Sequence, residues 1–183
     1  MKKLIQLTLV LFAISASVVA QDAKISWMTF DEALKAQKNE PKKIFMDVYT
    51  NWCGPCKMMD KNTFSHPKVA AYLNENYYPV KFNAEGDKKV KYQGKSYSNS
   101  NYDPKKQNTR NYPHDFTMAL GIQAYPTIAF FDETGKFIQP IPGYRSPKDL
   151  EIFLKLLAGD DYKNITTKEQ WEDYQENFEY TFE

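Results

Sequence analysis

The sequence has few cysteines, few histidines and almost no net charge, and each shortage excludes a class of protein. The 183 residues include two cysteines, which is too few for a framework of structural disulfides. The two histidines, His66 and His114, do not lie at standard ligand spacings, so a zinc site is not expected. Because 24 basic residues are balanced by 23 acidic ones, no strong field directs the chain to nucleic acid or acidic lipid.

A nearly continuous apolar run near the N-terminus predicts a cleaved export signal. The apolar run covers residues 4–12. Two lysines precede it, small residues follow it, and Val18–Ala20 fits a cleavage site. An uncleaved membrane anchor is the alternative, but the run is short for a membrane span. A lipoprotein is disfavoured because no cysteine lies near the cleavage site. We expect residues 1–20 to be a signal peptide cleaved near Ala20, and the protein to be exported to the periplasm or secreted.

The remainder of the chain predicts one α/β domain with a mixed sheet, at 21–160. Thr29 and Glu32 form a capping-box pattern at the start of a helix, and the apolar run Lys43–Tyr49 predicts a buried strand. Further strands are expected at 78–84, 125–131 and 137–141, and further helices after Pro55, Pro67 and Ser146. Helix and strand alternate early and a hairpin comes late, which is typical of a mixed sheet.

A polar insert at 86–115 does not fit the α/β pattern. Segments 90–92 and 95–97 flank Gln93-Gly94 and predict a small hairpin. A loop of this length is usually functional or mobile. Its lysines and tyrosines do not indicate a nucleic-acid partner, because aspartates are interleaved with them and export removes the usual ligand. His114, at its end, is expected to cap or precede a short helix.

A helical extension is expected at 161–183. Thr167 and Gln170 form a capping pattern for a helix that would carry Trp171, Tyr174 and Phe178 on one side. The simplest role of this aromatic stripe is to pack against the domain, and a role in partner docking is the alternative. The chain shows no internal repeat and no second domain.

Cys53 and Cys56 lie where a predicted strand turns into a helix, a position that favours redox chemistry. Pro55 suits the first helical turn, and the free N–H groups and the dipole there favour a thiolate on Cys53. We expect Cys53 to be the more exposed thiol and the nucleophile, and Cys56, one turn further in, to resolve the mixed disulfide. Trp52 would shield one side of the pair. Half of a zinc site and a purely structural disulfide are the alternatives.

The segment from Trp52 to Lys57, Trp-Cys-Gly-Pro-Cys-Lys, resembles the active-site motif of the thioredoxin family. Further matches keep the family order: Asp47 resembles its buried acid and Lys81 the neighbour of that acid. Ala124–Thr127 resembles the loop with the cis proline, which faces the cysteines in that family.

The resemblance implies a thioredoxin fold, a central mixed β-sheet flanked by helices, and two sets of site residues. The catalytic set is Cys53, Cys56, Asp47 and Lys81. The substrate-binding set is Trp52, Gly54, Pro55, Tyr125, Pro126 and Gly143, the last of which resembles a glycine of the substrate-binding rim.

Asp47 has a physical interpretation of its own. An acid on a buried strand is costly to ionise, so its pKa should be raised. Such a carboxyl group near Cys56 could take and return the proton of the resolving thiol. The alternative is a structural acid paired with Lys81, and the two roles are compatible.

The chain also departs from the family pattern. The proline that usually kinks the active-site helix is absent from 58–61, and Thr63–Pro67 breaks the segment instead, as in exported thioredoxin-like proteins of bacterial envelopes. Tyr49 stands where the family usually has tryptophan, and Tyr125 replaces a small aliphatic residue. These departures leave the chemistry intact but leave the partner and the redox potential open.

We therefore expect a monomeric thiol–disulfide oxidoreductase that acts on exported proteins and needs no cofactor and no metal. The Gly54-Pro55 pair resembles that of reducing thioredoxins, which favours a reductase supplied by a membrane-bound electron donor; an oxidase or isomerase is a variant of the same class. The alternative is a binding module that presents Trp52, Tyr125 and the insert to a protein partner, or that holds a soft metal on the two thiolates.

The N-terminal pattern predicts how the protein is processed. The mature chain should begin at or near Gln21 and fractionate with soluble envelope or secreted proteins, because the small residues before it fit a cleavage site. Intact-mass analysis of the purified protein measures this. A mass that includes Met1, or a lipid adduct, would contradict the prediction.

Overall fold

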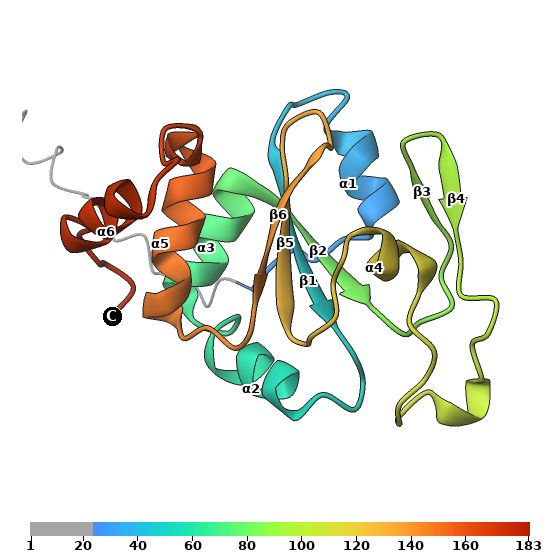
Figure 1. The fold of residues 1–183 in the computed structure, drawn as a ribbon. Helices are drawn as coiled ribbons and strands as arrows, with labels where there is room; N and C mark the ends of the chain where they lie inside the picture. The colour runs from blue at the N-terminus through green and yellow to red at the C-terminus, as the bar shows by residue number, and fades with distance from the viewer. Residues whose placement is uncertain (1–23) are drawn as a thin grey trace, which may run out of the picture.

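The computed structural model describes residues 24–183, in which a four-stranded sheet lies between two layers of helices (Figure 1). The strands are β1 (Lys43–Tyr49), β2 (Tyr77–Asn83), β5 (Thr127–Phe131) and β6 (Phe137–Pro142), in the order β2-β1-β5-β6. Because β1 is parallel to β2 and antiparallel to β5, and β5 is antiparallel to β6, the predicted mixed sheet is confirmed. The predicted signal peptide lies outside the described residues.

The two faces of the sheet carry separate apolar clusters because side chains alternate along each strand. Phe45 of β1 belongs to the cluster that includes side chains of α3 (Pro67–Asn76) and α5 (Pro147–Ala158). Its neighbours Ile44 and Met46 belong to the cluster that includes α1 (Phe30–Ala36) and α4 (Asp115–Ala119). Helices therefore cover both faces of β1, and Asp47 shares a face with Phe45.

The starts of the helices follow local signals, as predicted. Thr29, Ser146 and Thr167 each form a capping box, at the start of α1, α5 and α6 (Lys168–Glu176). A proline occupies the first turn of α2 (Gly54–Asn62), α3 and α5. In the described part of the chain, none of the helices combines the length and the apolar character needed to cross a membrane.

The insert contains the predicted hairpin and packs on the domain. Its strands are β3 (Val90–Tyr92) and β4 (Lys95–Tyr97), which pair antiparallel. The rings of Tyr92 and Tyr97 both lie 5.4 Å from the ring of Phe116 in α4, measured between centroids. These contacts bury part of the insert in the apolar cluster on the α1 side of the sheet.

The predicted boundaries of two strands differ from those in the structure. The strand expected from residue 125 begins two residues later, at Thr127, and the preceding residues form a loop. Proline cannot donate a hydrogen bond to a neighbouring strand, so Pro126 is unsuited to the ladder. The strand expected at 78–84 is shifted by one residue, to Tyr77–Asn83.

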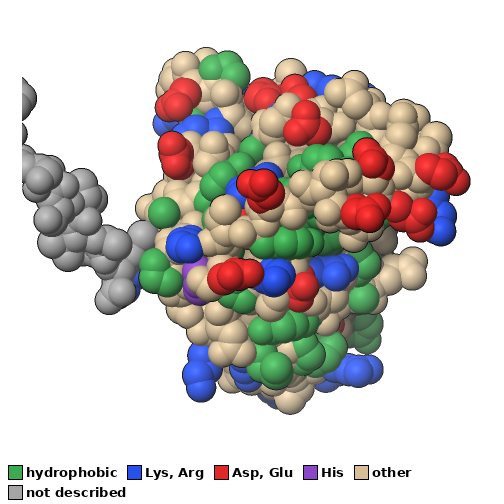
Figure 2. All heavy atoms as spheres, turned by 90° about the vertical axis from the view of Figure 1, so that its left-hand side faces the viewer, with side chains coloured by type: hydrophobic (Ala, Val, Ile, Leu, Met, Phe, Trp, Pro, Cys, Tyr) green, Lys and Arg blue, Asp and Glu red, His purple; other side chains and the backbone are tan. Residues whose placement is uncertain are grey.

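The C-terminal extension folds back onto α5. Glu151 is completely buried, and its carboxylate accepts hydrogen bonds from the backbone N–H groups of Thr181 at 2.8 Å and Phe182 at 2.7 Å. The ring of Trp171 stacks on Phe153 of α5, with centroids 5.8 Å apart. Figure 2 shows this side of the molecule, where hydrophobic side chains lie between charged ones. The aromatic stripe predicted for α6 therefore packs against the domain.

Glu151 should be required to hold the extension. In Glu151→Ala, the N–H groups of Thr181 and Phe182 lose their acceptor, so the free energy of unfolding should fall by about 2 kcal/mol. Chemical denaturation measures the change, and limited proteolysis should show faster cleavage in the extension. Glu172→Ala is the control, because its side chain is exposed. Equal stability of the two variants would contradict the prediction.

Candidate active site

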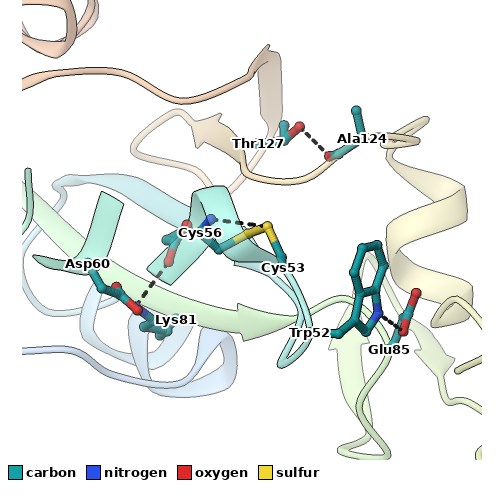
Figure 3. Close-up of a disulfide and its surroundings, with 9 residues drawn as sticks. Trp52, Cys53, Cys56, Asp60, Lys81, Glu85, Ala124 and Thr127 are labelled. Carbon is teal, nitrogen blue, oxygen red and sulfur yellow. Dashed lines mark hydrogen bonds and ion pairs between the residues drawn. A yellow bond between two sulfur atoms is a disulfide. The ribbon is translucent and has the colours of Figure 1, made fainter. Parts of the chain in front are cut away.

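The two cysteines lie at the N-terminus of α2 and are joined by a disulfide bond (Figure 3). Cys53 is the N-cap residue, and its sulfur accepts a hydrogen bond from the backbone N–H of Cys56 at 3.1 Å. After reduction, the same N–H group and the helix dipole would both stabilise negative charge on the Cys53 sulfur. The position of Cys53 therefore favours a thiolate.

The expectation that Cys53 is the more exposed cysteine is wrong for the disulfide form. The exposed fraction is 2% for Cys53 and 4% for Cys56, so both are buried. The disulfide bond turns the sulfur of each cysteine toward the other. The spacing of the two cysteines in the sequence does not indicate how exposed each sulfur is in this form. What distinguishes Cys53 from Cys56 is its place at the helix N-terminus.

The loop before β5 contains a cis peptide bond between Tyr125 and Pro126, as the family resemblance implies. The Thr127 hydroxyl donates to the Ala124 carbonyl at 2.7 Å, and the Gly143 N–H donates to the Pro126 carbonyl at 2.8 Å. Gly143 has a φ of +93°, which favours glycine there.

An aromatic contact brings the cis-proline loop next to the cysteine segment. The ring of Tyr125 packs edge-on against Trp52, with centroids 6.2 Å apart. Gly54 and Pro55 are exposed at the start of α2. The residues expected to contact substrate therefore come from two neighbouring segments that are far apart in the sequence.

Asp47 and Lys81 lie opposite one another in the register of β1 and β2, and their side chains meet. The Lys81 ammonium is 3.2 Å from Asp47 Oδ2. Asp47 is 2% exposed, and its Oδ1 has no hydrogen-bond partner among residues 24–183. Burial raises the pKa of Asp47 to about 6, although the positive charge of Lys81 opposes this shift. The carboxyl group can therefore change protonation state near neutral pH.

Lys81 has a second acidic partner, Asp60 of α2, which the sequence analysis missed (Figure 3). Its ammonium also lies over the rings of Trp27 and Tyr49, at 5.1 Å and 5.2 Å from their centroids. Burial alone would lower the pKa of Lys81, but the charges and hydrogen bonds of Asp47 and Asp60 outweigh it and raise the pKa. The sequence offered one indication that Asp60 lies near the site. It follows Cys56 by four residues, which places the two side chains on the same face of one helix.

Trp52 is held by a carboxylate that the sequence analysis also missed. Glu85 Oε2 accepts hydrogen bonds from Trp52 Nε1 at 2.7 Å and from the backbone N–H of Asn111 at 2.8 Å. The guanidinium carbon of Arg110 lies 4.8 Å from the centroid of the Trp52 ring. The insert thus reaches the active-site tryptophan. The unusual length of the insert was the only feature of the sequence that indicated a role for it near Trp52.

The two histidines lie at the starts of helices. His114 caps α4, as predicted, and its Nδ1 accepts a hydrogen bond from the Phe116 N–H at 3.0 Å. Burial lowers the pKa of His114. His66 is the N-cap residue of α3 without a side-chain hydrogen bond to the helix. Across residues 24–183, no group of three or more His, Cys, Asp or Glu side chains is arranged to hold a metal ion.

Comparison of sequences points to one family. A family model described as a thioredoxin-like domain matches residues 30–158. A stretch of 115 residues, 62% of this chain, is 26% identical to the thiol:disulfide interchange protein DsbD of Photorhabdus laumondii. That stretch corresponds to 15% of the length of DsbD, and among the curated relatives the matched share ranges from 15% to 60% of their own lengths.

Comparison of structures points to the same fold. A thioredoxin from Thermus thermophilus superposes with a TM-score of 0.56 at 13% identity, covering 79% of this chain and 98% of the thioredoxin. A candidate disulphide isomerase from Bacteroides thetaiotaomicron gives a TM-score of 0.51 at 27% identity, covering 76% of this chain and 97% of the other. The expected thioredoxin fold is therefore confirmed.

Asp47→Asn should change how stability depends on pH. The folded pKa of about 6 lies above the value of about 4 for an unfolded aspartate, so ionisation of Asp47 costs the wild-type protein stability as pH rises through this range. The asparagine variant lacks this loss. Relative to wild type, its free energy of unfolding should therefore be higher at about pH 7.5 than at about pH 4.5, by about 2 kcal/mol.

Chemical denaturation of the oxidised proteins at both pH values measures this difference. Glu172→Gln removes an exposed carboxylate and serves as the control, for which no such change with pH is expected. If Asp47→Asn destabilises the protein equally at both pH values, Asp47 is a fully paired structural acid.

Proposed function

The chain belongs to the thioredoxin-like family, and on that basis we propose that it is a thiol–disulfide oxidoreductase that reduces disulfides in exported proteins. The observation that carries the proposal is the Cys53–Cys56 disulfide at the N-terminus of α2, where a backbone N–H donates to the Cys53 sulfur. A purely structural disulfide that spans so few residues would stabilise the fold little. Redox exchange is the better explanation for this pair.

In the first step, the thiolate of reduced Cys53 attacks one sulfur of a substrate disulfide. A bond forms between Cys53 and that sulfur, the substrate disulfide breaks, and its other sulfur leaves as a thiolate that takes a proton from water. The hydrogen bond from the Cys56 N–H and the dipole of α2 favour the thiolate that this step requires.

In the second step, Cys56 resolves the mixed disulfide. Its thiol gives a proton to Asp47, its sulfur attacks Cys53, and the second substrate sulfur leaves as a thiolate. The substrate has then gained two electrons and the protein has lost two, stored as the Cys53–Cys56 disulfide. Asp47 suits the proton transfer because its pKa of about 6 lets it accept and release a proton near neutral pH. Lys81 positions this carboxyl group and Asp60 shares the lysine.

The substrate segment is proposed to lie between the cysteine segment and the cis-proline loop. Its contacts on one side are with Trp52, Gly54 and Pro55. On the other side they are with the loop at Tyr125–Pro126 and with Gly143, whose N–H fixes the carbonyl of Pro126. The packing of Tyr125 on Trp52 supports this arrangement, because it joins the two sides into one surface.

Reduction rather than oxidation is supported by the dipeptide Gly54-Pro55, which resembles that of reducing thioredoxins. The N-terminal sequence pattern supports export, and the relatives named for disulfide interchange and disulfide isomerisation support protein disulfides as the substrate class. Restoring the dithiol requires two electrons, which we assign to a membrane-bound dithiol donor because soluble reductants are scarce outside the cytosol.

The mechanism predicts different behaviour for the two cysteine variants. Cys56→Ser should accumulate mixed disulfides on Cys53, because serine cannot resolve them. Cys53→Ser should lose the ability to accelerate insulin reduction by dithiothreitol, falling to the uncatalysed rate. Insulin turbidity and non-reducing mass spectrometry measure these outcomes.

The double variant Cys53→Ser/Cys56→Ser is the control and should trap nothing. A wild-type protein that does not accelerate insulin reduction, or a Cys56→Ser variant that traps no more partners than the double variant, would refute the proposed function.

A further inference from the structure

A loop of the insert closes against the active-site tryptophan and is held there by several hydrogen bonds. Glu85 bridges Trp52 Nε1 and the backbone N–H of Asn111. The side chain of Asn51, beside Trp52 in the chain, donates to the carbonyl of Gln107 at 2.6 Å. Arg110 lies between these two attachment points, with its guanidinium carbon 4.8 Å from the centroid of the Trp52 ring.

The loop is also braced internally. Asn111 Oδ1 accepts from the backbone N–H of Asp103 at 3.1 Å, and Asn111 Nδ2 donates to the Asp103 carbonyl at 2.8 Å. Asn99 Nδ2 donates to the Tyr112 carbonyl at 2.7 Å. The backbone on both sides of Arg110 is therefore fixed relative to Trp52. The guanidinium charge of Arg110 is in this way held beside the cysteine pair.

Between this loop and the cis-proline loop lies a groove of about 750 Å³. Its lining includes Trp52, Arg110, Met118, Ile122 and Tyr125. Met118, with an exposed fraction of 55%, gives the groove an accessible apolar surface. Because Trp52 and Tyr125 belong both to this groove and to the proposed substrate-binding surface, the groove continues that surface away from the cysteines.

The charge that the groove offers to a ligand is positive. Glu85 and Arg110 are the charged residues in its lining. Glu85 is buried, and its Oε2 already accepts from Trp52 and Asn111. Arg110 is exposed and forms no ion pair with any residue in the described range 24–183. A guanidinium group in this position can bind a carboxylate through two parallel hydrogen bonds.

We propose that this groove is a specificity subsite for substrate proteins in which an acidic and an apolar side chain lie next to the reactive cysteine. The acidic side chain pairs with Arg110 over the Trp52 ring, and the apolar side chain lies against Met118 and Ile122. The inference rests on the proposed function, because it concerns the disulfides that Cys53 attacks. Arg110 here acts in binding and takes no part in the exchange chemistry.

Two disulfide-linked peptide dimers that differ only in one residue beside the cysteine test the assignment. One peptide carries Glu-Leu and the other Lys-Leu, and single-turnover reduction of each by the fully reduced protein is followed by rapid quenching and chromatography. The Glu-Leu peptide should react about five- to tenfold faster at low salt, and the ratio should shrink at high salt. Arg110→Gln should remove the preference and Arg110→Glu should invert it.

Lys105→Glu is the matched control, because this exposed residue of the same loop does not line the groove. It should keep the preference of the wild type, which separates the effect of the subsite from a general effect of net charge. Equal rates for the two peptides, or a preference that survives Arg110→Gln, would overturn the subsite while leaving the proposed function intact. Failure of the reduced wild-type protein to reduce either peptide would overturn the proposed function and the subsite with it.

Discussion

Strand β1 is covered on both faces and paired along both edges, so any charge that it carries must be compensated inside the protein. Of its two charged residues, Lys43 pairs with Glu133 and Asp160, and the other is Asp47. The parallel register of β1 and β2 brings Lys81 beside it, and Lys81 is also shared with Asp60 of α2. One ammonium group thus links the buried acid, the sheet and the helix that carries Cys56. The ion-pair network of Asp47, Lys81 and Asp60 therefore spans β1, β2 and α2.

A second link fixes the other side of the cysteine segment. Glu85, just after β2, holds the ring of Trp52 and the backbone of Asn111 in the insert. Figure 3 shows the disulfide between this pair and the Lys81–Asp60 pair. The proposed chemistry therefore depends on groups anchored to the sheet, whereas the proposed substrate-binding surface includes a surface loop. This division allows the partner to change with the loop while the redox pair stays the same.

Local signals accounted for much of the fold. The capping patterns at Thr29 and Thr167 and the helix start at Ser146 were identified from residue type and spacing, because a helix cap involves residues only three apart in the chain. The family resemblance identified the pairing of Asp47 with Lys81 and the cis bond before Pro126. Asp60, Glu85 and Arg110 were missed, because their partners Lys81 and Trp52 come from other segments of the chain. In the disulfide form both cysteines are buried, which the motif did not indicate, since burial depends on what surrounds the sulfur.

The sequence by itself determined that the chain is an α/β domain with a close cysteine pair at a helix N-terminus. These properties follow from apolar periodicity, from helix capping and from a short motif, all of which act over a few residues. Only the tertiary structure decided which charges surround the pair. The pKa of Asp47 depends on the depth of burial and on its distance from Lys81, and the placement of Arg110 over Trp52 depends on how a long insert returns to the site. Both are set by contacts between residues distant in the chain, which local patterns do not encode.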